Sequence, residues 1–531
     1  MFDPQYYPYA SRRHLVYGHR GMVASSHPLA TQAGLKILHE GGNAVDAALA
    51  TAAALTVVDP ANNGVAGDCF AIVSMKGEKL AGLNSSGFSP ALLTRERVKA
   101  EGFDRIPNQG WLPVTVPGAP AGWAALHERY ATRPMAELFA PAIELTQGYA
   151  LSPDNAPILN HFTKAFDGKP LLDEWVKAFN PNKKRFRAGD LFAPVQMGDT
   201  LRRLAESDCR DLYEGELAMT IDAYSRRTNG TLRAEDLAAY APRWVEPVGT
   251  SFRGYEVWEL PPNGQGMTAL IALNILDALP LHGADPVEKV HMQMEAVKLA
   301  FADALHYIAD PAFMRIPAQQ LLSKEYAKSR AALIEDEAKV YAHGSPLKGD
   351  TVYFCCADGQ GNSISMIQSL YQGFGSGVTI PGTGICLQDR GACFSMQPGH
   401  ANEAAPRKYP YHTIIPGFLT RDGRPVGPFG IMGGYMQPQA HTQVMVHLLD
   451  EGLNPQAALD APRFCWNEGL KFDLEPGFNP AVVDALRRRG HEINMITGGQ
   501  YGRGQIIARA GEDESWVGAT EPRADGSVIG F

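Results

Sequence analysis

The character of the chain changes at Thr351, and this change constrains the fold more than any other feature of the sequence. Before it, residues 113–333 contain mostly helical patterns between Pro- and Gly-containing loops, and residues 343–350 form a polar loop. After it, the apolar run 352–357, a glycine-containing turn and the run 363–369 predict a β-hairpin. A helical layer, two sheets and another helical layer fit this distribution better than alternating strand–helix–strand units.

The N-terminal part of the chain supplies clear helix signals. Residues 28–40 are apolar at helical spacing and end at Gly41 and Gly42, which mark the end of a helix. Asn43 can then cap an alanine-rich helix that runs to Val58, and its small side chains suit close packing against a sheet. Four further elements are expected, namely strands over 69–74 and 80–84 and helices over 286–307 and 438–450.

Composition and charge narrow the class of protein. The chain has 531 residues, of which 45% are hydrophobic and 20% charged, and its formal net charge is −9. The negative balance gives no electrostatic basis for binding nucleic acid or an anionic membrane. No run approaches the roughly 20 apolar residues of a membrane helix, and the N-terminal residues lack the basic and apolar regions of a secretory signal. We therefore expect a cytoplasmic protein without nucleic-acid or membrane partners.

The motifs of common cofactor sites are missing. The seven cysteines show no CxxC pair or zinc-ligand spacing, which favours buried free thiols in a reducing compartment. The fifteen histidines form no HExxH motif, and the acidic residues form no calcium loop. Segments 262–266 and 373–377 are glycine-containing but lack the other features of nucleotide-binding loops, so we expect turns that bring backbone close to a site. The sequence thus predicts neither a metal nor an organic cofactor.

Thr351 also offers a chemistry of its own. A threonine at the head of a strand is usually only a residue that favours the strand. If the chain is cut before it, however, one residue carries both a hydroxyl nucleophile and a free α-amine. Because such an amine titrates at a pKa of about 8 in model peptides, its unprotonated fraction can act as the base for the hydroxyl.

Other residues can complete such a site. The expected hairpin returns Ser369 and Tyr371 towards Thr351, at the head of its first strand. Gly433 and Gly434 precede an expected helix, where two backbone N–H groups can face one oxyanion. Taken singly, Ser369 has a plainer explanation as a strand serine, the glycine pair as a turn, and His412, in the second site-like loop at 409–413, as a core or surface histidine. Their joint occurrence behind Thr351 suggests an active site.

Ordered segments along nearly the whole chain carry a resemblance to a known family. These segments are 38–47, 58–60, 64–70, 295–303, 430–434 and 460–464. In them the chain resembles the γ-glutamyltransferase (γ-glutamyltranspeptidase) family of N-terminal-nucleophile hydrolases. The resemblance implies a four-layer αββα sandwich and a precursor that cuts itself between Asp350 and Thr351. The resulting fragments, 1–350 and 351–531, would be intertwined in one domain as a heterodimer, or as a dimer of heterodimers.

The resemblance also implies roles for single residues. Thr351 corresponds to the catalytic threonine, whose hydroxyl attacks an amide carbonyl and forms an acyl-enzyme that water or an amine then resolves. Gly433 and Gly434 match the oxyanion-hole glycines. Ser369 occupies the position of a hydroxyl residue that contacts the nucleophile and assists processing.

The departures from the family pattern concern substrate recognition. Segment 83–90 has no arginine, although typical γ-glutamyl enzymes clamp the donor α-carboxylate with an arginine there. The acidic residue that typically holds the α-amine falls at about Cys393. His412 and Thr413 replace paired serines, and Tyr371 replaces an asparagine. The resemblance therefore implies retained chemistry and a rewritten substrate site that includes these three residues.

Arg390 is the candidate for a replacement carboxylate clamp, because a guanidinium fork binds a carboxylate through two hydrogen bonds; a structural salt bridge is the alternative. The pattern is similar to the cytosolic branch of the family, which includes acylases and small-amide hydrolases. We expect a self-processing N-terminal-threonine amidohydrolase or acyltransferase that acts on a small amide. The alternatives are a true γ-glutamyltransferase acting on glutathione and a non-catalytic protein of the same fold. The missing arginine predicts weak γ-glutamyl turnover.

Overall fold

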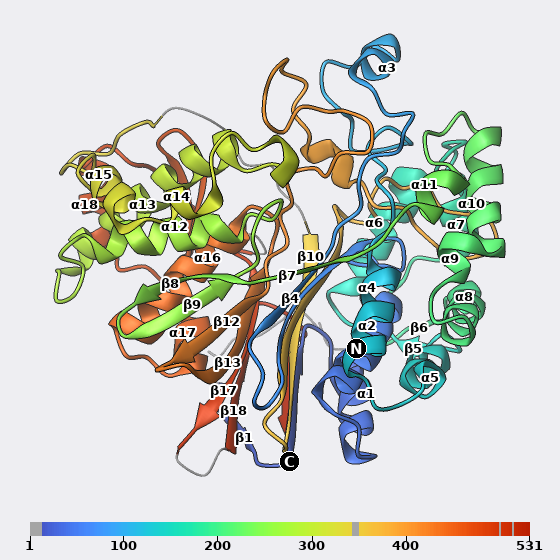
Figure 1. The fold of residues 1–531 in the computed structure, drawn as a ribbon, viewed down its shortest axis with the longest axis horizontal. Coiled ribbons are helices and arrows are strands. Elements are labelled where there is room, and N and C mark those ends of the chain that lie inside the picture. The colour runs from blue at the N-terminus through green and yellow to red at the C-terminus, as the bar shows by residue number, and fades with distance from the viewer. Residues whose placement is uncertain (1–12, 342–349, 499–500, 512–514) are drawn as a thin grey trace.

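Two seven-stranded sheets lie face to face at the centre of the computed structural model, and helices cover the outer face of each (Figure 1). The structure describes residues 13–341, 350–498, 501–511 and 515–531. The four-layer αββα sandwich predicted from the sequence is confirmed.

The first sheet combines strands from the two ends and the middle of the chain. Its strands are β1 (Val16–Gly18), β8 (Val248–Phe252), β9 (Tyr255–Glu259), β12 (Gly417–Arg421), β13 (Arg424–Met432), β17 (Arg503–Ala510) and β18 (Ser515–Thr520). They are ordered β1–β18–β17–β13–β12–β9–β8, and all neighbours are antiparallel. The sequence predicts mostly helix where β8 and β9 lie. These two short strands are only partly buried at one edge of the sheet, so their apolar pattern is weak.

The second sheet holds the predicted hairpin at its centre. Its strands are β2 (Gly21–Ser25), β3 (Asp68–Ser74), β4 (Ala81–Ser85), β7 (Arg243–Val245), β10 (Asp350–Asp358), β11 (Ser363–Tyr371) and β19 (Ser527–Gly530). The order is β19–β2–β10–β11–β3–β4–β7, again with antiparallel neighbours. The β10–β11 hairpin therefore lies between strands that precede it by some 300 residues. Both sheets interleave strands from before and after Thr351.

One helical layer packs on the second sheet through α1 (Pro28–His39) and α2 (Ala44–Val58) (Figure 1). Between the two helices, Gly41 has φ +89°, a left-handed conformation that favours glycine. The Asn43 side chain accepts hydrogen bonds from two N–H groups at the start of α2, while Asp46 accepts one from the Asn43 N–H. All residues of α2 are buried, because alanines let the helix approach the sheet closely. Both helices were predicted.

The other helical layer covers the first sheet. It contains α12 (Gly266–Asp277), α13 (Pro286–Tyr307) and α16 (Met436–Met445), which continues as a π-helical turn over Val446–Asp450. The predicted helix over 286–307 is confirmed. The two sheets approach closely at Gly430, where an added Cβ would lie 2.3 Å from the ring of Tyr353.

The remaining elements surround these layers. The helices are α3 (Arg95–Ala100), α4 (Ala119–Tyr130), α5 (Met135–Leu145), α6 (Asn155–Phe166), α7 (Asp173–Phe179), α8 (Val195–Glu206), α9 (Asp211–Glu214), α10 (Glu216–Arg227), α11 (Ala234–Ala238), α14 (Ala318–Leu321), α15 (Lys324–Ala331), α17 (Pro455–Asp460) and α18 (Pro480–Arg488), with 3₁₀ turns at Pro311–Phe313 and Arg390–Cys393. The smaller sheets comprise β14 (Phe464–Glu468), β15 (Lys471–Leu474) and β16 (Glu492–Met495), and β5 (Tyr149–Ala150) with β6 (Leu191–Phe192).

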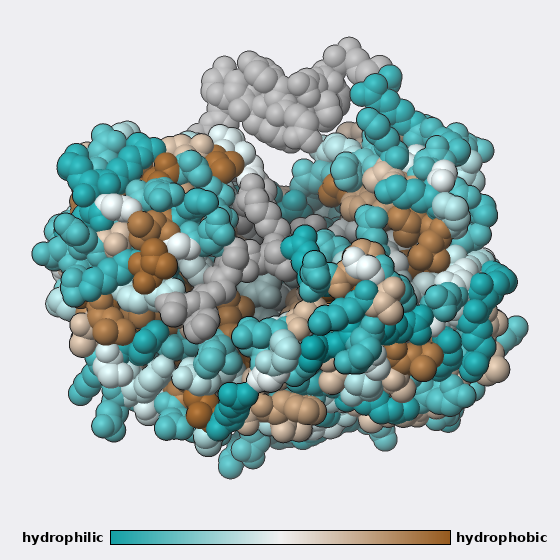
Figure 2. Space-filling model, turned by 90° about the horizontal axis from the view of Figure 1, so that it is seen from above, coloured by the Kyte–Doolittle hydropathy of each residue, from teal (hydrophilic) through white to brown (hydrophobic). Residues whose placement is uncertain are grey.

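The surface seen from above mixes apolar and hydrophilic residues (Figure 2). In the part of the chain that the structure describes, no helix is both long and apolar enough to span a bilayer. All seven cysteines are free thiols; six are buried and Cys465 is partly exposed. The expectation of free thiols is therefore confirmed, with Cys465 the exception to full burial.

Candidate active site

Thr351 lies at the head of β10 and is 1% exposed. A bulge interrupts the β10–β11 ladder between the pair Asp350–Tyr371 and the pair Val352–Gln368. This bulge directs the Thr351 hydroxyl to Ser369, whose Oγ accepts a hydrogen bond from Thr351 Oγ1 at 3.2 Å. The hairpin thus returns Ser369 to the threonine, as the sequence predicts.

The start of α16 faces the same hydroxyl. Gln437, in the first turn of α16, donates from Nε2 to Thr351 Oγ1 at 3.4 Å and from its backbone N–H to the Gly434 carbonyl at 3.2 Å. Gly433 and Gly434 precede this helix with φ values of +136° and +58°, which non-glycine residues rarely adopt. The predicted oxyanion glycines therefore lie at a helix N-terminus close to Thr351, where backbone N–H groups favour negative charge.

Gln265 ties two of the site loops together. Its side chain is fully buried, and Nε2 donates to the Thr413 carbonyl at 2.6 Å and to the Gly434 carbonyl at 2.8 Å. Its backbone N–H donates to the His412 carbonyl at 2.8 Å. Segment 262–266 is therefore a turn against the site, as the sequence predicts, but the role of its glutamine was not predicted.

Arg390 is fully buried beside the hairpin. Its Nη1 donates to Thr413 Oγ1 at 2.6 Å, and its guanidinium carbon lies 4.4 Å from the centroid of the Tyr371 ring. The nearest ion-pair contact is Nε to Asp68 Oδ2 at 4.0 Å. Within the described residues, Arg390 Nη2 and Tyr371 Oη have no oxygen or nitrogen hydrogen-bond partner, and both side chains interact with the thiol of Cys393. Both polar atoms are buried, and such groups ordinarily have partners, so this pair can receive an acceptor group of a ligand.

Asp68 organises the other side of this network. Its Oδ2 accepts from His412 Nε2 at 2.6 Å, and its Oδ1 accepts from the Gly87 N–H and from Gln388 Nε2, both at 2.8 Å. The Ile414 N–H donates to His412 Nδ1 at 3.3 Å, which places the ring proton on Nε2. Burial, followed by the charge of Arg390, lowers the pKa of His412 to about 4, so the ring is neutral near pH 7.

The predicted site residues form one connected region. The Tyr371 N–H donates to Ser369 Oγ at 2.8 Å. Together with the contacts above and the Gly433–Gly434 peptide, this bond links Thr351, Ser369, Tyr371, Arg390, His412, Thr413, Gly433 and Gly434. Sequence reasoning missed Asp68, Gln265 and Gln437. A buried carboxylate at the start of the apolar strand β3 was the available signal for Asp68, whereas nothing in the sequence distinguishes the two glutamines.

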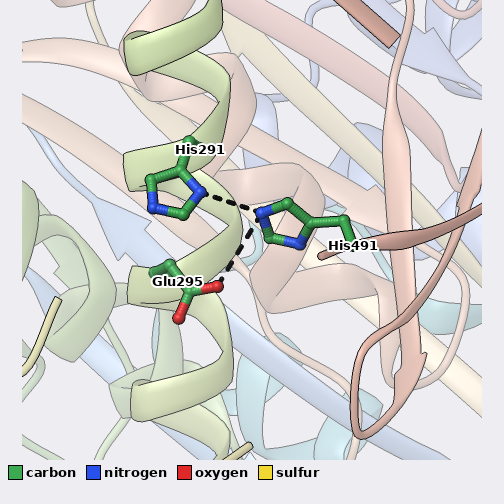
Figure 3. A group of neighbouring side chains, drawn as sticks. All are labelled: His291, Glu295 and His491. Atoms are coloured by element: carbon green, nitrogen blue, oxygen red, sulfur yellow. Dashed lines mark hydrogen bonds and ion pairs between the residues drawn. The ribbon is translucent and has the colours of Figure 1, made fainter. Parts of the chain in front are cut away.

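A separate group of ligand-type side chains lies between α13 and the segment after α18. His291, Glu295 and His491 offer atoms within 4.8 Å of one another, and all three are buried (Figure 3). The sequence predicts no metal, and His491 is 200 residues from His291, so spacing could not reveal this group. Lys298 lies 2.5 Å from Glu295 Oε1, which already compensates the charge of that carboxylate.

Comparison with known proteins now identifies the family. The Gamma-glutamyltranspeptidase family model matches residues 30–531. The chain is 36% identical to the glutathione hydrolase-like YwrD proenzyme of Bacillus subtilis (strain 168), over 97% of this chain and 99% of that protein. It is 34% identical to the oxamate amidohydrolase proenzyme of Klebsiella pneumoniae subsp. pneumoniae, over 96% and 98%. The crystal structure of a cephalosporin acylase from Bacillus halodurans matches with a TM-score of 0.96 and 49% identity, over 100% and 99% of the two chains.

The names of these relatives describe enzymes that hydrolyse or transfer amide bonds, and this chain is an enzyme of that class. The family model that matches residues 30–531 specifies which family of such enzymes this chain represents. The chain belongs to the gamma-glutamyltranspeptidase family.

The neutral, buried His412 predicts a contribution to acid lability. Folding lowers its pKa to about 4, while the unfolded chain takes up this proton near a pKa of about 6.5. The contribution of the neutral His412 ring to stability is therefore complete above its pKa in the unfolded chain and is lost as the pH falls towards 4. In urea unfolding, the free energy of unfolding of wild type should fall by about 1–2 kcal/mol more between pH 6.5 and 5 than that of His412→Gln. His14→Gln, at an exposed histidine, is the control and should lose as much as wild type. Equal losses of unfolding free energy in all three proteins would contradict a neutral, buried His412 in the folded protein.

Proposed function

We propose that this enzyme is a self-processing amidohydrolase or acyltransferase whose nucleophile is Thr351 as a new N-terminus. The observation that carries the proposal is the buried Thr351 hydroxyl at the head of β10, 3.2 Å from Ser369 Oγ. Gln437 brings the Gly433–Gly434 turn to the same hydroxyl. Relatives described as proenzymes support a chain that is cut during maturation.

The first reaction is the cut itself. Thr351 Oγ1 adds to the carbonyl carbon of residue 350, the C–N bond breaks, and the nitrogen takes the hydroxyl proton, which leaves an ester. Ser369, as the hydrogen-bond partner of the hydroxyl, orients it for this attack. Water then hydrolyses the ester, which restores the hydroxyl and releases residue 350 as a carboxylic acid. Thr351 is left with a free α-amine.

Turnover then uses both groups of Thr351. The neutral amine takes the hydroxyl proton as the oxygen attacks the substrate amide carbonyl. Gly433 and Gly434 stabilise the resulting oxyanion through backbone N–H groups at the start of α16. The amine half of the substrate then leaves with this proton, and the acyl half remains bound to Thr351 as an ester. Water or an acceptor amine attacks this ester and releases the acyl group. Hydrolysis and acyl transfer differ only in this last step.

The two fragments, 1–350 and 351–531, remain together as a heterodimer after the cut. Strands β10 and β11 lie between β2 and β3, and β12 and β13 lie between β9 and β17. Separating the fragments would break both sheets and expose the core between them. The whole processed unit, of which two copies can pair, is therefore the enzyme that binds the small amide.

The substrate is proposed to be an amide whose acyl half carries a carboxylate. Among the described residues, Arg390 Nη2 and Tyr371 Oη have no oxygen or nitrogen partner and only the weak thiol of Cys393 beside them, and both residues are fully buried. Asp68 is a weak counter-ion for Arg390, because its oxygens already accept three other hydrogen bonds. This favours the ligand clamp over the salt-bridge interpretation of Arg390. The name of the related oxamate amidohydrolase indicates an amide that carries a carboxylate.

Substitution of the nucleophile tests processing. Thr351→Ala removes the hydroxyl, so the protein should remain one polypeptide of 531 residues on a denaturing gel and should have no amidase activity. Thr351→Ser keeps a hydroxyl and should be cut and active, which controls for changes at this strand position. A Thr351→Ala protein that is cut or active would refute the proposal, and an uncut wild type would favour the non-catalytic alternative.

Three chromogenic amides test the substrate. Butyryl-, glutaryl- and γ-glutamyl-p-nitroanilide differ stepwise by a carboxylate and then by an α-amine. We expect the highest kcat/KM for the glutaryl amide, because Arg390 can pair with its carboxylate while an added α-amine would meet no acidic residue at the position of Cys393. Arg390→Met should lower kcat/KM for the glutaryl amide by about 10- to 150-fold, the loss of a charged hydrogen bond, and change the butyryl value less than threefold. Faster turnover of the γ-glutamyl amide would favour a true γ-glutamyltransferase.

A further inference from the structure

Four buried side chains form a polar cluster away from Thr351. His291, Glu295 and Lys298 recur along one side of α13, and His491 follows α18; all are at most 3% exposed. His291 Nδ1 lies 2.9 Å from His491 Nε2, and His491 Nε2 lies 3.8 Å from Glu295 Oε1 (Figure 3). Glu295 Oε1 and Lys298 Nζ are 2.5 Å apart. We call these four residues the arm anchor.

The charges of the arm anchor balance without a metal ion. The ammonium of Lys298 is paired with the carboxylate of Glu295, so a divalent cation at the two histidines would be placed against a positive charge. Burial, followed by the nearby Lys298, lowers the pKa of His491 to about 3, so its ring is neutral. The neutral His491 ring and the Glu295–Lys298 ion pair therefore leave no uncompensated charge, and the other contacts of the cluster indicate its role.

The arm anchor binds the backbone of residues 335–341, which we call the arm. His291 Nε2 lies 2.7 Å from the Glu335 carbonyl and must donate, because a carbonyl only accepts. Lys298 Nζ donates to the Lys339 carbonyl at 2.7 Å. Two side chains of one helix thus hold two carbonyls of an arm that has no helix or strand of its own.

A third bond comes from the chain next to His491. The Ala338 N–H donates to the Arg489 carbonyl at 2.7 Å, two residues before His491. Lys298 Nζ also lies 5.6 Å from the centroid of the Tyr341 ring. Because the arm has no regular secondary structure, these bonds fix its path from the inside of the protein.

The arm leads directly to the proposed cut. Tyr341 precedes Asp350 by nine residues and Thr351 by ten, so the position of Tyr341 confines Asp350 to within roughly 30 Å. Asp350 is itself held opposite Tyr371 at the start of β10, so holding Tyr341 fixes the other end of the same short segment and restricts the orientations open to the 350–351 peptide. We propose that the arm anchor is a positioning device for self-cleavage, which holds the arm so that the 350–351 peptide reaches the Thr351 and Ser369 hydroxyls. This inference rests on the proposed self-processing.

The test separates processing from turnover. Glu295→Gln/Lys298→Met removes the ion pair together with the bond to Lys339, and leaves no buried charge unpaired. Each protein is made by pulse-chase translation, and the loss of the full-length chain is followed on denaturing gels. The half-time of cutting should lengthen at least tenfold. Once fully cut, the variant should turn over glutaryl-p-nitroanilide with kcat and KM within twofold of wild type, since the arm anchor does not touch substrate.

Matched variants exclude a general loss of stability. Asp303→Asn/Arg330→Met removes another ion pair of α13, with an N–O distance of 3.1 Å, that makes no hydrogen bond to the arm; its cutting half-time should match wild type. Ala338→Pro removes the N–H that binds Arg489 and also fixes φ at this residue, whereas Ala338→Ser retains the N–H. Ala338→Pro should slow cutting several-fold at an unchanged melting temperature, while Ala338→Ser should not. If Glu295→Gln/Lys298→Met fails to fold, the comparison of Ala338→Pro with Ala338→Ser still tests the inference.

Each outcome has one meaning. Cutting at the wild-type rate in Glu295→Gln/Lys298→Met or in Ala338→Pro would overturn the inference while leaving the proposed function intact. A wild-type chain that is never cut would instead refute the proposed function. A wild-type cutting rate that rises with added Zn²⁺ or falls with a chelator would assign the two histidines to a metal and also overturn the inference. We expect neither reagent to change the rate.

Discussion

The antiparallel pairing of β10 with β11 is the constraint on which the site depends. Both strands are buried within the second sheet, and β2 and β3 pair with their outer edges. A slip of one residue in this register would turn every side chain of the hairpin to the other face of the sheet. The surrounding strands therefore fix the register, and the bulge after Asp350 fixes the direction of the Thr351 hydroxyl. The chemistry of the site depends on this local geometry.

The same pairing would hold the two proposed fragments together after the cut. The hairpin begins one residue from the proposed scissile bond, yet strands from the first part of the chain flank it on both sides. Most of the stabilising contacts of the hairpin are therefore lateral and do not depend on the continuity of the backbone at residue 350. A break there would free an amine at the proposed site while both sheets persist.

Buried charge is the second constraint. A buried guanidinium costs several kcal/mol unless it is paired and hydrogen-bonded. Arg390 has Thr413 as one firm partner and Asp68 as a distant one. Asp68 is in turn satisfied by His412, whose ring is kept neutral. Asp68 is thus better satisfied than Arg390, and this difference supports the proposed role of Arg390 as a clamp for a carboxylate.

Local signals allowed much of the fold to be predicted. The cap at Asn43, the glycines before it and the periodicity of residues 286–307 define helices that the structure confirms. Strands β8 and β9 escaped prediction because they are short and half-buried at an edge.

The candidate site, like the fold, could be predicted from the sequence only in part. The hairpin and the Gly433–Gly434 turn follow from local pattern, but the bond between Asp68 and His412 joins residues 344 positions apart. Gln265 and Gln437 act through backbone carbonyls and a hydroxyl that only the folded chain brings near. Such long-range polar contacts leave no periodicity in a single sequence, so reasoning from residues could not assign them.

The most direct test of the account is the intact mass of purified, catalytically active wild-type protein, with sequencing of every N-terminus present. The account predicts two fragments, the smaller of which begins at Thr351 and contains 531 − 350 = 181 residues. An active preparation in which residues 350 and 351 are still joined by a peptide bond would contradict it.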